Sequence, residues 1–137
     1  MHPMFRNIIA FLAGLIIGGL CNYYSLQIFG SIFGVPEGVD PTDIESIKDN
    51  MHFYEFKHFL TPFLAHALGS LIAAFVCTKI AAKYHLGLSL GLGLLYLFGG
   101  YAMVMSLPSP TWFNVMDLSL AYFPMVYLGW FLAGRKS

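Results

Sequence analysis

The chain has 137 residues, of which 58% are hydrophobic and only 10% are charged, and its formal net charge is zero. A soluble domain carries about 25% charged residues, so this composition indicates lipid as the surrounding solvent and excludes an ordinary soluble domain. The neutral balance also argues against nucleic acid as a partner, because such proteins carry a basic patch.

Four long apolar segments follow one another along the chain, each close to the ~20 residues that cross a bilayer as a helix. They cover about residues 8–29, 58–80, 86–107 and 112–133. None of them alternates strictly between apolar and polar residues, as the strands of a membrane barrel do. The sequence therefore predicts a single membrane domain over residues 1–137, an all-α integral membrane protein built as an antiparallel bundle of four transmembrane helices.

Charged residues are segregated between these predicted spans. All acidic residues except Asp117 lie between Val35 and Lys57, in the loop after the first span. The basic residues outside that loop lie near the amino terminus, between the second and third spans and in the tail, as Arg6, Lys79, Lys83, Arg135 and Lys136. Short loops rich in Lys and Arg stay in the cytoplasm, so both termini are predicted to be cytoplasmic and the acidic loop to face outward.

The acidic loop has the signature of a short helix over about residues 41–50. Asp40 precedes Pro41, as an N-cap residue precedes a proline in the first helical position. Apolar residues recur at helical spacing along one face, as Ile44, Ile47 and Met51. We expect an extracytoplasmic amphipathic helix on the membrane surface or over the bundle, either as an ordered lid or as a gate for a ligand.

Asp117 is the one charged residue well inside a predicted span, roughly 7–8 Å below the outer boundary if Trp112 marks that boundary. A carboxylate there is costly and normally faces other helices or a water-filled cavity. Residues at similar depth in the other spans predict a polar cluster of Asp117, His66, Asn22 and Tyr101. The cluster is either a proton- or cation-sensitive site that opens outward, since a carboxylate favours the charged form of a neighbouring histidine, or a packing contact.

A second polar group leads into the second predicted span. His52, Glu55 and His58 are spaced by three residues, and His66 follows about two turns later. Imidazole and carboxylate groups bind zinc and copper, so these four residues are candidate metal ligands. Side chains wetted by lipid headgroups at the interface explain the same pattern, and the sequence identifies no cofactor.

Two further features predict how the spans pack. Small residues recur every four positions in three spans, as Gly14 and Gly18, as Ala65, Gly69 and Ala73, and as Gly87 and Gly91. Such stripes let helices approach closely, either within the monomer or between copies. Pro124, midway along the fourth span, is expected to leave the carbonyl of Leu120 without its helical partner and to bend the helix.

Three strings resemble a group of small bacterial membrane proteins of the kind found in Bacteroidota. They are PEGVD at 36–40, KHF at 57–59 followed by AHALG at 65–69, and LPSPTWF at 107–113. The resemblance covers nearly the whole chain. It implies a setting in the inner membrane of a bacterium, and it implies no activity or site residues.

No catalytic or nucleotide-binding motif is present, so the sequence leaves three function classes open. The preferred one is an accessory or assembly subunit that acts through other membrane proteins. The second is a minimal transporter or channel that works as a homo-oligomer, with Asp117 and His66 in its pathway. The third is a membrane-embedded enzyme or metalloprotein that uses the histidines of residues 52–66.

Overall fold

The computed structural model describes residues 1–134, and all regular structure among them is helical. The elements are α1 (Pro3–Phe33), α2 (Ile44–Asp49), a short 3-10 helix (Met51–Phe53), α3 (Phe56–Ile80), α4 (His85–Ser106), α5 (Thr111–Leu120) and α6 (Phe123–Leu132). Four segments are long and apolar enough to cross a membrane, namely α1, α3, α4 and the α5–α6 pair. The prediction of an all-α chain with four such segments is confirmed, and α1 extends beyond both ends of the first predicted span.

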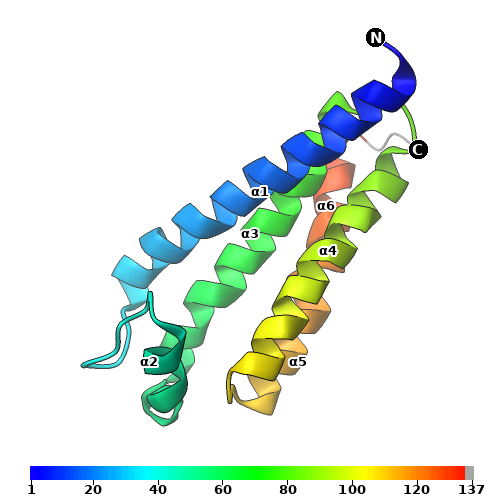
Figure 1. The fold of residues 1–137 in the computed structure, drawn as a ribbon. Coiled ribbons are helices and arrows are strands. Elements are labelled where there is room, and N and C mark those ends of the chain that lie inside the picture. The colour runs from blue at the N-terminus through cyan, green and yellow to red at the C-terminus, as the bar shows by residue number, and fades with distance from the viewer. Residues whose placement is uncertain (135–137) are drawn as a thin grey trace.

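The two ends of the bundle differ in what they carry. Figure 1 shows the N terminus and the last turn of α6 close to the turn between α3 and α4, and we call this side of the bundle the terminal end. At the opposite end, which we call the α2 end, lie α2 and the turn between α4 and α5. The acidic segment between α1 and α3 therefore belongs to the α2 end, away from the N terminus and from the end of α6.

Close contact between α1 and α3 depends on glycine. A Cβ atom at Gly14 would lie 2.6 Å from the carbonyl oxygen of Ala73, and one at Gly18 would lie 2.5 Å from the Ala73 Cβ. Atoms in a packed interior do not approach so closely, so both positions need a residue without a side chain. The small-residue stripe of α1 thus serves packing within the monomer, whereas Gly87 on α4 has no atom within 4 Å of such a Cβ.

Hydrogen bonds hold the start of α1 against the turn between α3 and α4. The Arg6 Nε donates to the carbonyl oxygen of Ile80 at 2.6 Å. The Asn7 Oδ1 accepts from the backbone N–H groups of Ala82 at 2.9 Å and Lys83 at 3.2 Å. These bonds satisfy backbone groups that the end of α3 leaves without helical partners, and they fix the terminal end.

The short outer helix begins later than the sequence predicted. Its N-cap is Asp43, whose side chain accepts a hydrogen bond from the backbone two residues further along, and helix α2 begins at Ile44. Asp40 instead closes a turn, since its Oδ1 accepts from the hydroxyl of Thr42 at 2.6 Å and from its N–H at 2.9 Å. These hydrogen bonds from Thr42 lower the pKa of Asp40. The predicted N-cap at Asp40, with Pro41 as the first helical residue, is therefore wrong.

The fourth membrane-length segment is interrupted near its middle. Helix α5 ends at Leu120 and α6 begins at Phe123, with Ala121 and Tyr122 between them. Pro124 has no backbone N–H, so the carbonyl of Leu120 cannot form its helical bond and the chain leaves helical geometry just beyond it. Tyr122 has φ −113° and ψ −85°, outside the helical region. The helix is thus interrupted at the position where Pro124 was expected to disturb it.

Gly18→Ala should lower the free energy of unfolding by about 1–3 kcal/mol, the usual cost of overpacking, because the new methyl group would meet α3. Gly19→Ala is the matched control, since its nearest neighbour would lie 3.9 Å away. That change should be neutral or stabilising, because alanine favours a helix over glycine. Thermal unfolding in detergent measures both variants, and equal losses would contradict the proposed packing.

Candidate functional site

Asp117 and His66 meet between α5 and α3. The Nδ1 of His66 lies 2.9 Å from the Oδ1 of Asp117, whose side chain is almost completely buried. An ionised carboxylate only accepts hydrogen bonds, so the Nδ1 carries the proton and donates it. A neutral His66 ring then keeps a lone pair on Nε2, which can accept a further hydrogen bond.

Tyr122 is the second donor to the carboxylate. Its hydroxyl donates to the Oδ2 of Asp117 at 3.1 Å and lies 3.2 Å from the Nδ1 of His66. Its ring stacks on the imidazole with a centroid separation of 5.8 Å. We call Asp117, His66 and Tyr122 the carboxylate cluster.

Sequence reasoning missed Tyr122 because of its spacing from the carboxylate. In a continuous helix, a residue five positions after Asp117 lies about 140° around the axis and faces away from it. The interruption between α5 and α6 removes this phase relation, so the tyrosine hydroxyl can turn back toward the carboxylate. Pro124 was the signal that could have identified this contact.

The ring of Tyr122 packs against α4 at Gly100, where only a glycine leaves enough space. A Cβ atom at Gly100 would overlap the hydroxyl and the ring of Tyr122. The tyrosine ring is 2% exposed, so it has little room to move aside. The backbone of α4 therefore forms part of the wall around the carboxylate cluster.

The other two predicted members form no hydrogen bond with this group. Asn22 on α1 packs against Gly69, where its Cβ would be 2.9 Å from an added Cβ. Its Oδ1 is buried without a hydrogen-bond partner among the described residues. Tyr101 on α4 has a side chain that is 54% exposed. The structure thus brings together only Asp117 and His66 of the four predicted residues.

A cavity of about 810 Å³ lies next to the carboxylate cluster, in the half of the bundle toward the α2 end. Its walls are the second half of α1, the first half of α3, the last turns of α4 and the first turns of α5, and α2 with its flanking loops lies along it. Asp117 and His66 both line it, and the described lining contains no other carboxylate and no Lys or Arg. Mostly apolar walls with a few polar groups, at roughly 300–1,000 Å³, are typical of small-molecule sites.

Two buried polar atoms on the cavity wall add to its hydrogen-bonding capacity. The Thr61 Oγ1 and the Asn114 Oδ1 have no partner among the described residues, and both residues line the cavity. A buried polar atom without a partner costs about 1–3 kcal/mol, so a molecule that supplies donors here would be stabilised. Together with Asp117, these atoms make the cavity rich in hydrogen-bond acceptors.

The candidate metal ligands do not assemble into a centre. Within residues 1–134, no three His, Cys, Asp or Glu side chains lie close enough to share a metal ion. Glu55 and His58 form a reciprocal capping box at the start of α3, in which the Nδ1 of His58 accepts from the Glu55 N–H at 2.8 Å. The ring of His52 lies tilted against the ring of Phe53, and His66 binds Asp117. The Glu-x-x-His spacing is thus explained by a helix start.

Comparisons with protein-family models, curated proteins and solved structures found no match for the chain. The resemblance of its three strings to small bacterial membrane proteins stays a prediction. Function therefore has to be inferred from the cavity and the carboxylate cluster.

Tyr122→Phe should lower the free energy of unfolding by about 1.5–3 kcal/mol, the range for a hydrogen bond to a charged group, because Asp117 loses one of its two donors. The ring itself is kept, so the contact with Gly100 is preserved. Tyr127→Phe, at a position 52% exposed on α6, is the control and should have no effect. Unfolding in detergent measures both, and an unchanged Tyr122→Phe protein would show that the hydroxyl does not support the carboxylate.

Proposed function

We propose that the chain is an integral membrane protein, an antiparallel four-helix bundle that binds a small amphipathic ligand in its larger cavity and acts as a minimal carrier. The ligand has a hydrocarbon part and a head that donates hydrogen bonds, such as an ammonium group. The observation that carries the proposal is the cavity of about 810 Å³ with Asp117 as the only carboxylate among its described lining residues.

The membrane setting is supported by four helical segments of sufficient length and apolar character. Arg6, Lys79 and Lys83 lie toward the terminal end, and the acidic segment lies toward the α2 end. Basic ends face the cytoplasm, so both termini are inside in this proposal. Arg135 and Lys136, which the sequence-based topology also used, lie outside the described residues. With the resemblance to Bacteroidota membrane proteins, this favours a bacterial inner membrane.

The proposed ligand chemistry follows from the groups on the cavity wall. Asp117 supplies a negative charge, and the lone pair on the Nε2 of His66 supplies an acceptor. The orphan oxygens of Thr61 and Asn114 supply two more. A cationic or hydroxyl head satisfies these acceptors, and the apolar wall accommodates a hydrocarbon chain. Acidic residues of the α1–α3 segment would raise the local concentration of cations outside the bundle.

A carrier rather than a static binder is supported by the interruption between α5 and α6. Membrane transporters place ligand sites beside discontinuous helices, where unwound backbone lines a cavity. Here the interruption at Ala121 and Tyr122 directly follows the helix that bears Asp117. An intramembrane carboxylate normally marks a substrate or ion pathway.

A second candidate function, an accessory subunit that acts through other membrane proteins, is favoured by Tyr24 on α1. Tyr24 is 57% exposed, lies well inside the helix and does not line the larger cavity. Hydroxyl groups that face hydrocarbon lack partners, and a neighbouring protein helix or a second copy of this chain would supply them. Native mass spectrometry from mild detergent distinguishes a monomer, a homo-oligomer and a complex with another protein.

Decylammonium, in protein-loaded nanodiscs, tests the ligand proposal. Asp117→Asn should weaken its binding about tenfold or more, because hydrogen bonds to charged groups contribute about 1.5–3 kcal/mol. Decanoate has the same chain length and the opposite charge, so it should bind weakly to both proteins. Isothermal titration measures affinity, and a thermal unfolding curve shows that the variant is folded. Equal affinity of both proteins for decylammonium would contradict the proposed site.

A further inference from the structure

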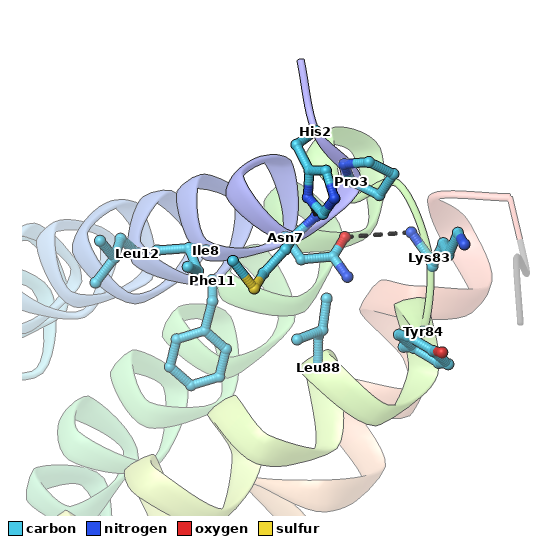
Figure 2. A pocket seen from close by; sticks show the side chains of 10 residues that line it. His2, Pro3, Asn7, Ile8, Phe11, Leu12, Lys83, Tyr84 and Leu88 are labelled. Carbon is cyan, nitrogen blue, oxygen red and sulfur yellow. Dashed lines mark hydrogen bonds between the residues drawn. The ribbon is translucent and has the colours of Figure 1, made fainter.

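A second cavity lies at the terminal end, between the first turns of α1 and the start of α4. Its volume is about 510 Å³. Figure 2 shows apolar side chains along this groove, among them Ile8 and Phe11 from α1 and Leu88 from α4. The side chains of His2, Lys83 and Tyr84 gather at one end of it. The groove thus has apolar walls along most of its length and polar, basic side chains at one end.

We propose that this groove binds one anionic phospholipid, with its phosphate between His2 and Lys83 and an acyl chain along α1. The inference rests on the membrane setting proposed above. It is independent of the carboxylate cluster and of the ligand in the larger cavity.

Charge complementarity identifies the headgroup. Lys83 takes part in none of the ion pairs found within residues 1–134, and no Asp or Glu lines the groove. The Nδ1 of His2 accepts from the Met4 N–H at 3.2 Å, so the neutral ring has its proton on Nε2 and can donate. Basic pockets between membrane helices on the cytoplasmic side bind anionic headgroups, and Arg6 adds positive charge at the start of α1.

The walls of the groove are fixed before any lipid arrives. Asn7 accepts two backbone hydrogen bonds from the α3–α4 turn, one of them from Lys83 and drawn in Figure 2. Arg6 donates to Ile80 in the same turn. Tyr84 follows with φ 56° and ψ 36°, a left-handed conformation that reverses the chain into α4. A site whose walls are already ordered loses less conformational entropy on binding.

The groove has a length that suits one leaflet. The lining residues on α1 run from His2 to Leu12, which corresponds to roughly 15 Å at ~1.5 Å per residue. The hydrocarbon core of a bilayer is ~30 Å thick, so this length covers about half of it. A chain that enters from the cytoplasmic surface would therefore stay within its own leaflet.

Native mass spectrometry of protein released from nanodiscs tests this site, with equal amounts of phosphatidylglycerol and phosphatidylcholine in the bilayer. We expect the wild-type chain to retain one phosphatidylglycerol preferentially. Lys83→Gln should lower that retention about fivefold, the effect expected of one lysine near an anionic surface. Lys79→Gln removes the same charge from the same end, outside the groove lining, and should leave retention nearly unchanged.

A second pair of variants tests the apolar part of the groove. Ile8→Trp places a large side chain in the groove and should abolish preferential retention, because Ile8 lines it. Ile9→Trp is the control, since Ile9 is as exposed as Ile8 (47% against 48%) but does not line the groove. Equal retention by Lys83→Gln and Lys79→Gln, or by the two tryptophan variants, would overturn the proposal.

Competition with glycerol 3-phosphate, a headgroup without acyl chains, tests whether the groove recognises a whole lipid or only a phosphate group. Glycerol 3-phosphate should not displace the retained lipid, because it has no chain to fill the groove; displacement at millimolar concentration would overturn the lipid assignment. Failure of the membrane setting would give a different result, since the protein would then appear in the soluble fraction before any lipid was compared.

Discussion

A carboxylate buried among apolar helices needs hydrogen-bond donors. Without them, the buried charge would destabilise the fold by far more free energy than a single packing contact contributes. Asp117 obtains two donors, His66 from α3 and Tyr122 from the start of α6. Much of the local architecture follows from this requirement. The interruption after α5 turns the tyrosine toward the carboxylate, and Gly100 on α4 leaves space for its ring. Three helical segments are thereby positioned around one charged group.

The two ends of the bundle carry charges of opposite sign, and the helices pack differently at each end. At the terminal end, hydrogen bonds donated by Arg6 and accepted by Asn7 join the start of α1 to the α3–α4 turn, and the charged side chains described there are basic. Toward the α2 end, the helices line the larger cavity, which is partly open, and the segment along it is acidic. Glycine-mediated contact at Gly14 and Gly18 keeps α1 against α3 midway between the ends. In the proposed carrier, this middle contact would act as a fixed support while the α2 end admits a ligand.

The sequence predicts the features that depend on composition and on single residues with strong backbone effects. Long apolar runs identify four helical segments, and Pro124 identifies the interruption in the last one. The members of the site were harder to predict, because counting residues from a membrane boundary gives the depth of a side chain but not its rotation about the helix axis. Asn22 and Tyr101 were assigned by depth alone, and neither is hydrogen-bonded to the carboxylate cluster. Tyr122 was missed because its hydroxyl reaches Asp117 only where the helix is interrupted between α5 and α6. The short helix was misplaced because Asp40 and Asp43 are both good caps, and Thr42 draws Asp40 into a turn.

The pairing of Asp117 with His66 also has a consequence for biosynthesis. An aspartate within a span raises the free energy of insertion, by up to about 2.5–3.5 kcal/mol at the centre, and the α5–α6 segment that carries Asp117 is the least apolar of the four. His66 precedes Asp117 by 51 positions, so the ribosome synthesises His66 well before Asp117. In the proposed membrane setting, the last segment would enter a bilayer in which α3 already offers its imidazole. The order of synthesis thus allows a segment that inserts poorly by itself to carry the single intramembrane charge.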